Sequence, residues 1–213
     1  MLILISIFFS SFVIALSGAM MPGPLLAATI SESARRGFIA GPLLVFGHSI
    51  LELALMISLL VGLAPLLQHA LVFVVIALTG SLILFWMAFG MFRSLPALRL
   101  PQAAEPSEHD HLAISGALLS LSNPYWVIWW ATIGLGYILQ SLQYGPWGIA
   151  FFFAGHVLAD LVWYAAVSAG VSKGRHFLND RLYRGIAGTC AGFLVVFAGY
   201  FLYAGCIFIS CLH

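Results

Sequence analysis

Long apolar stretches follow one another along this chain, and short polar stretches separate them. Each apolar stretch approaches or exceeds the roughly twenty residues that a helix needs to cross a bilayer. None shows the sustained alternation of polar and apolar residues that is typical of membrane β-strands. The pattern predicts six apolar helical segments, at residues 3–33, 38–63, 70–92, 112–139, 147–171 and 185–209.

The composition supports a protein that lies within a lipid bilayer. Hydrophobic residues make up 62% of the chain and charged residues only 7%, with a mean hydropathy of +1.08. A soluble domain would carry about a quarter charged residues. The net charge of +1 gives no electrostatic reason to expect nucleic-acid binding. We therefore predict an all-α polytopic membrane protein with six transmembrane helices.

The basic residues are distributed very unevenly among the connections. All eight of them follow the first, third or fifth segment, and the connections after segments two and four contain none. Connections that carry Lys and Arg stay on the cytoplasmic side of a membrane. This predicts an even number of spans in the plasma membrane, with both termini outside the cytoplasm. The basic residues are Arg35, Arg36, Arg93, Arg99, Lys173, Arg175, Arg181 and Arg184.

A short polar pattern occurs once in each half of the chain. A glycine and a histidine are followed, four residues after the histidine, by an acidic residue. The two copies are Gly47, His48 and Glu52 in the second segment, and Gly155, His156 and Asp160 in the fifth. We predict two three-helix repeats, residues 1–100 and 112–213, joined by a cytoplasmic linker at 101–111. Three spans is an odd number, so the second repeat is inverted, as in many secondary transporters.

Prolines predict that the first and fourth segments are broken helices. Pro22 and Pro24 cannot both lie inside a regular helix, because each lacks an N–H group and clashes with the preceding turn. Asn123 and Pro124 form a similar interruption in the fourth segment. A helix that restarts within the membrane has free N–H groups at its N-terminus, and these can hold an anionic group. A kink that only serves packing is the alternative.

The repeated histidines and acids lie near the middle of their segments, where a charged carboxylate costs about 3 kcal/mol on insertion scales. A spacing of four places each pair on one helix face. One interpretation is a polar lock between helices. The other is a transport site, in which the acids bind an ammonium group, the broken helices bind a carboxylate, and a histidine carries a proton. The candidate residues are His48, Glu52, His156, Asp160, Pro22, Gly23, Pro24, Asn123, Pro124 and Trp126.

These motifs resemble the lysine exporter (LysE/RhtB) family of amino-acid translocators over nearly the whole chain. Met21 precedes the Pro-Gly-Pro sequence, and Gly37 and Gly41 follow it. The resemblance implies efflux of amino acids or their derivatives across the plasma membrane, driven by an ion gradient. Leu25 stands where many members have a polar residue. Aromatic residues also follow Asn-Pro here, and the repeated Gly-His pair is not general in the family.

Two other functions compete with an exporter of amino acids or amines, which we expect to be coupled to protons. A divalent-metal exporter of the same fold would use His48, Glu52, His156 and Asp160 as ligands. A membrane enzyme is disfavoured, because no His-Glu-x-x-His or Gly-x-Ser-x-Gly motif occurs. We therefore expect no enzymatic activity and no cofactor. A small molecule and the bilayer are the expected partners, and the sequence leaves open whether the protein forms a homo-oligomer.

Overall fold

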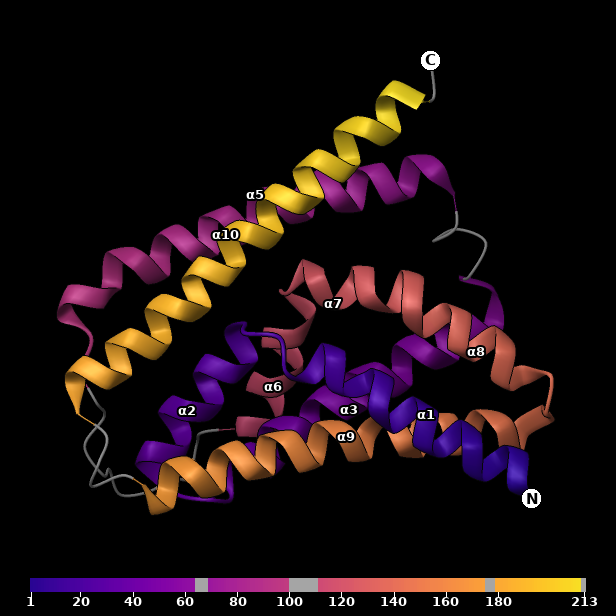
Figure 1. Ribbon diagram of the computed structural model, residues 1–213, viewed down its shortest axis with the longest axis horizontal. Coiled ribbons are helices and arrows are strands. Elements are labelled where there is room, and N and C mark those ends of the chain that lie inside the picture. The colour runs from indigo at the N-terminus through magenta and orange to yellow at the C-terminus, as the bar shows by residue number, and fades with distance from the viewer. Residues whose placement is uncertain (64–68, 100–110, 175–178, 212–213) are drawn as a thin grey trace.

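The computed structural model describes residues 1–63, 69–99, 111–174 and 179–211, and every regular element in these ranges is a helix (Figure 1). The short helices are η1 (Leu59–Leu63), η2 (Leu95–Ala97) and η3 (Trp130–Gly134). Residues 101–110 of the predicted linker lie outside the described residues, as does Arg175. The longer helices are α1 (Leu2–Ala19), α2 (Pro24–Arg36), α3 (Ala40–Ser58), α5 (Ala70–Ser94), α6 (Leu112–Leu121), α7 (Pro124–Trp129), α8 (Leu135–Leu142), α9 (Gly145–Lys173) and α10 (Asp180–Cys211).

Among the described residues, five helices are long and apolar enough to cross a membrane. They are Leu2–Ala19, Ala40–Gly62, Val74–Ala97, Gly145–Lys173 and Asp180–Ile207. The predicted fourth segment is instead divided among α6, α7, η3 and α8, and α6 has only ten residues. The structure therefore confirms a multi-helix membrane protein. A sixth span assembled from these shorter pieces stays a prediction.

Both proline motifs coincide with interruptions of a helix. The chain leaves α1 at Ala19 and enters α2 at Pro24, and it leaves α6 at Leu121 and enters α7 at Pro124. Each proline occupies the first position of its helix, where the missing N–H group would have no partner in any case. The two interruptions also meet in space, because a Cβ atom on Gly23 would lie 3.5 Å from Nδ2 of Asn123.

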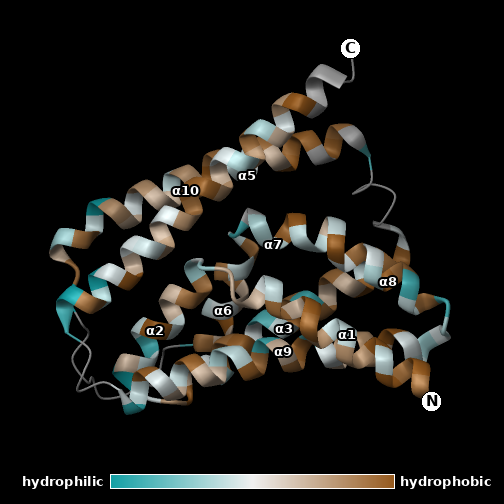
Figure 2. Cartoon of the chain, viewed as in Figure 1, coloured by the Kyte–Doolittle hydropathy of each residue, from teal (hydrophilic) through white to brown (hydrophobic). Residues whose placement is uncertain are grey.

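The long helices pack in three pairs. Helix α1 lies along α9, α3 lies along α6, and α5 lies along α10 (Figure 1). The α5–α10 pair touches the remaining helices partly through α7, where Ile128 joins an apolar cluster with Leu84 and Leu194. Hydrophobic residues run along the helices, and hydrophilic residues gather mainly near helix ends (Figure 2). This distribution is the one expected for helices surrounded by lipid.

Two glycines shape the connection between α2 and α3. Gly37 has a φ of 81°, a left-handed conformation that glycine adopts without strain. Gly41 allows α3 to approach α9, because a Cβ atom there would collide with Ser168 and with the carbonyl of Tyr164. The Ser168 hydroxyl accepts a hydrogen bond from the Gly41 N–H at 2.9 Å and is bonded to Ser33 Oγ at 2.7 Å. This buried contact joins α2, α3 and α9.

Candidate functional site

The glycine of each Gly-His pair brings its helix against a neighbouring backbone. A Cβ atom on Gly47 of α3 would overlap the carbonyl of Ala113 in α6, and one on Gly155 of α9 would overlap the carbonyl of Phe8 in α1. Close backbone approach of this kind is typical of small residues in membrane helices. The glycines therefore set the position of the histidine that follows each of them.

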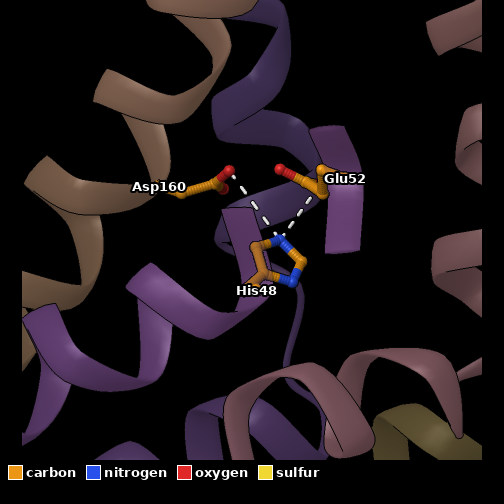
Figure 3. A group of neighbouring side chains, drawn as sticks. All are labelled: His48, Glu52 and Asp160. Carbon is orange, nitrogen blue, oxygen red and sulfur yellow. Dashed lines mark ion pairs between the residues drawn. The ribbon is translucent and has the colours of Figure 1, made fainter. Parts of the chain in front are cut away.

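The four ionisable side chains of the two repeated patterns meet in one buried cluster. Nε2 of His48 lies 3.0 Å from Glu52 Oε1 and 3.8 Å from Asp160 Oδ2 (Figure 3). Nε2 of His156 lies 3.1 Å from Glu52 Oε1 and 3.5 Å from Asp160 Oδ2. The four residues are between 1% and 7% exposed. Residues about a hundred positions apart in the sequence thus form a single site between α3 and α9.

Two indole groups also contact the Glu52 carboxylate. Nε1 of Trp126 lies 3.2 Å from Glu52 Oε1, and Nε1 of Trp130 lies 3.0 Å from the same oxygen. An indole N–H only donates, so Oε1 accepts both bonds. The second carboxylate oxygen, Oε2, is buried and accepts no hydrogen bond from any residue that the structure describes. The Glu52 carboxylate is therefore held through Oε1, and Oε2 is left to accept a hydrogen bond from a ligand.

The contacts of Ser120 favour one position for the hydrogen on the His48 ring. The hydroxyl of Ser120 donates its single proton to the carbonyl of Gly116 at 2.7 Å, and the same Oγ contacts Nδ1 of His48. With that proton already used, Oγ can only accept from His48. We therefore assign a hydrogen to Nδ1, which leaves Nε2 facing the two carboxylates.

The other histidine has no such partner. Ser11 of α1 donates a hydrogen bond to the Phe152 carbonyl of α9. On the other side of the site, Gly116 of α6 lies against the Leu44 carbonyl of α3. Four residues after Gly116 comes Ser120, but four residues after Ser11 comes Ala15, which has no hydroxyl group. Within the described part of the chain, Nδ1 of His156 is buried without a hydrogen-bond partner, as is Oδ2 of Asp160. The two histidines therefore differ in the surroundings of Nδ1.

These side chains line a small cavity between the two helix interruptions. It offers about 50 Å³ to the centres of water-sized molecules, which is room for a few waters or one small polar group. Five of its lining residues are aromatic. The lining is Ala15, Gly18, Ala19, Met21, Gly23, Leu25, His48, Glu52, Ser120, Asn123, Tyr125, Trp126, Trp129, Trp130, His156, Asp160 and Tyr164.

Apolar clusters lie on both sides of the cavity along the helix axes. One cluster includes Leu26 of α2, Leu44 of α3 and Leu112 at the start of α6. The other includes Ile7 near the start of α1 and Phe152 of α9. The interruption between α1 and α2 falls between them. Packed hydrophobic side chains thus adjoin the cavity in two separate clusters.

The structure gathers most of the predicted site residues around this cavity. The two histidines, the two acids, Gly23, Asn123 and Trp126 line it, whereas Pro22, Pro24 and Pro124 belong to the interruptions beside it. Our sequence analysis did not include Ser120, Trp130 or Tyr164 among the site residues. Trp130 had a visible signal, since it lies one helical turn after Trp126. Ser120 lies close to the interruption and resembles the other small residues of α6.

The cluster contains a donor set for a cation. His48, Glu52 and Asp160 each offer one atom, and these atoms lie within 4.8 Å of one another. Two indole N–H groups, however, point at Oε1 of Glu52. Their hydrogens carry partial positive charge and do not ionise, so they disfavour a metal ion bound to that oxygen. An ammonium group would need only acceptor atoms, which Oε2 of Glu52 and Oδ2 of Asp160 still provide.

Comparison with known proteins places the chain among transporters. The family model for LysE type translocators matches residues 16–205. The "Putative amino acid efflux protein YcgF" of Bacillus subtilis is 27% identical over 203 residues, covering 94% of this chain and 97% of that protein. The "Chemotactic transduction protein ChpE" of Pseudomonas aeruginosa is 27% identical over 164 residues, covering 75% and 79%. No solved structure matches the chain.

Proposed function

Because the chain belongs to the family of LysE type translocators, we propose that it is a secondary transporter that exports amino acids or related small amines across the plasma membrane. The observation that carries this proposal is the cavity in which two histidines and two acids meet beside two interrupted helices. Buried ionisable groups at membrane depth are a functional site by default. The relative YcgF, by its name, is also associated with amino-acid efflux.

An inverted repeat accounts for the packing of the helices. In the proposed arrangement, residues 1–100 and 112–213 are the two repeats, and α3 corresponds to α9. The packing of α3 on α6 then corresponds to that of α9 on α1. Gly47 and Gly155 make equivalent backbone contacts. The positions of the Lys and Arg residues favour cytoplasmic connections after α2, α5 and α9, with both termini outside.

The two ends of an amino acid would use different parts of the site. Glu52 and Asp160 supply the negative charge for its ammonium group. For the carboxylate we propose the N-terminus of α2. No side chain among the described residues caps this N-terminus, and Leu25 in its first turn lines the cavity. The N-terminus of α7 is less suitable, because the Asn123 side chain already accepts from the N–H of Tyr125 at 3.1 Å.

The contact between His48 and Glu52 supports exchange of substrate for a proton. Nδ1 of His48 already carries a hydrogen, so the 3.0 Å contact from Nε2 to Oε1 of Glu52 needs one further proton to avoid two facing lone pairs. An ammonium group that entered here would bring its own donors, and the bridging proton could leave. Proton and substrate would then compete for one position, which is what coupled antiport requires.

The apolar clusters on either side of the cavity would serve as gates. Opening the cluster around Leu26 and Leu112 would expose the site to the cytoplasm, and opening the cluster around Ile7 and Phe152 would expose it to the outside. Alternation between these states is the usual mechanism of transporters built from inverted repeats.

Transport by the purified protein in proteoliposomes tests the proposal directly. We expect uptake or efflux of one or more amino acids or small amines from a panel, and a pH gradient should drive their accumulation. Each amino acid should be compared with the amine that lacks its carboxylate. Because the amine cannot bind to the α2 N-terminus, we expect its flux to be slower. Divalent metals form the other arm of the panel. Metal flux that is abolished by His48→Ala and His156→Ala, without flux of any amine or amino acid, would contradict the proposal.

A further inference from the structure

The cavity presents three acceptor atoms that come from two helices and point toward one another. We propose that substrates bind through a primary ammonium group whose three N–H bonds are accepted by His48, Glu52 and Asp160, and that Ser120 is the positioning residue that prepares His48 for this role. The inference rests on the proposed transport of amino acids and amines. It adds which chemical group of the substrate is recognised and what determines the selectivity.

Two of the three acceptors have no hydrogen-bond donor among the residues that the structure describes. Oε2 of Glu52 and Oδ2 of Asp160 are buried, and no N–H or hydroxyl donor among the described residues is hydrogen-bonded to either oxygen. A buried acceptor that is left unpaired costs about 1–3 kcal/mol, and more when it belongs to a charged group. A ligand that brings several N–H donors removes this cost. A cationic hydrogen-bond donor would therefore satisfy both oxygens.

The third acceptor depends on Ser120. Because the Ser120 hydroxyl donates to the Gly116 carbonyl at 2.7 Å, it can only accept from Nδ1 of His48. A neutral His48 held in this way has its lone pair on Nε2, the atom that lies 3.8 Å from Asp160 Oδ2 and 3.0 Å from Glu52 Oε1. Without Ser120, the hydrogen of the neutral ring could lie on Nε2 instead, and the third acceptor would be lost.

The walls of the cavity suit an organic cation. Tyr125, Trp126, Trp129, Trp130 and Tyr164 line it, and the faces of aromatic rings attract ammonium groups. This attraction does not depend on N–H bonds, so it would act equally on a fully methylated ammonium group. The three acceptors, in contrast, require N–H bonds. Loss of the preference for the primary form in Ser120→Ala therefore separates recognition by the acceptors from attraction by the aromatic rings and from exclusion of the larger group by the small cavity.

His156 provides an internal comparison on the other side of the site. Its Nδ1 has no partner, and Ala15 occupies the position that corresponds to Ser120. Nothing equivalent to the Ser120 contact therefore determines the tautomer of His156. A hydroxyl group introduced at Ala15 should consequently leave the selectivity for primary ammonium groups in place, whereas removal of the Ser120 hydroxyl should reduce it.

The test measures competition in proteoliposomes that carry the full chain. Each amino acid that the transport assay shows to be carried competes against its N,N,N-trimethyl derivative, which keeps the positive charge and the carboxylate but has no N–H bond. We expect the wild-type protein to prefer the primary form at least tenfold. Ser120→Ala should reduce this preference about threefold to tenfold, as loss of one hydrogen bond implies. Ser120→Thr, which keeps the hydroxyl, and Ala15→Ser should retain it.

The outcomes separate the inference from the proposed function. Equal competition by the trimethyl derivative, with transport of amino acids intact, would overturn the role of the three acceptors and leave the transporter assignment standing. Full preference in Ser120→Ala would overturn the role of Ser120. Failure to carry any amino acid or amine would overturn the proposed function and this inference together. Because the first comparison uses the wild-type protein, it does not depend on how well a variant folds.

Discussion

Replacing Glu52 by Gln should lower the rate of amino-acid flux by roughly 10- to 100-fold, as expected for loss of a charged hydrogen-bonding partner. The amide keeps an oxygen that can accept from Trp126 and Trp130, which lie 3.2 and 3.0 Å from Oε1. It removes the charge that attracts an ammonium group. Asp160→Asn should act in the same direction. Membrane insertion should be retained or improved in both variants, because each removes a buried charge. Initial rates in proteoliposomes measure the effect.

Glu32 offers a matched control for the Glu52 variant. It belongs to α2 but pairs with Arg35 at 3.1 Å and with Arg36 at 2.7 Å, away from the cavity. Partly exposed ion pairs of this kind contribute about 0–1 kcal/mol. Glu32→Gln should therefore keep flux within a few-fold of the wild-type rate. Wild-type flux in both Glu52→Gln and Asp160→Asn would refute our assignment of the site.

Substituting alanine for Gly47 should lower the thermal unfolding temperature by roughly 2–12 °C, because overpacking of this kind costs about 1–3 kcal/mol. The added Cβ atom would overlap the Ala113 carbonyl, so α3 and α6 would have to separate. Gly155→Ala should have a similar effect through the Phe8 carbonyl of α1. Unfolding of the detergent-purified variants, followed by tryptophan fluorescence, measures these shifts.

Another helical glycine provides the control for these substitutions. A Cβ atom on Gly199 of α10 would have nothing within 4 Å. Gly199→Ala should therefore leave stability unchanged or raise it by up to about 1 kcal/mol through helix propensity. If Gly47→Ala and Gly199→Ala unfolded at the same temperature, the close packing of α3 against α6 would not have the importance that we give it.

The sequence revealed those parts of the site that leave a signature in an apolar background. A histidine and an acid are costly in a membrane helix, so the two Gly-His patterns stood out. Prolines interrupt helices for local steric reasons, which made the breaks at Pro24 and Pro124 predictable. The structure shows interruptions at both places and brings Gly23 of the first close to Asn123 of the second.

The remaining features depend on how helices pack, and local patterns do not carry that information. The convergence of two indoles and two imidazoles on one oxygen of Glu52 follows from the relative placement of α3, α7, η3 and α9. The contrast between Ser120 and Ala15 becomes visible only when the packing of α6 against α3 is compared with the packing of α1 against α9. The number of spans was also harder to predict, because hydropathy does not show where α6 ends and α7 begins.

A structure of the protein with a transported amino acid bound would test the central claim most directly. We predict that the amino acid occupies the cavity between the two helix interruptions, with its ammonium nitrogen within hydrogen-bonding distance of Glu52 and Asp160. The account would be contradicted by an amino acid whose ammonium nitrogen lies beyond hydrogen-bonding distance of both Glu52 and Asp160. One such place is the apolar groove that Pro24 of α2 forms with Trp86 and Met91 of α5.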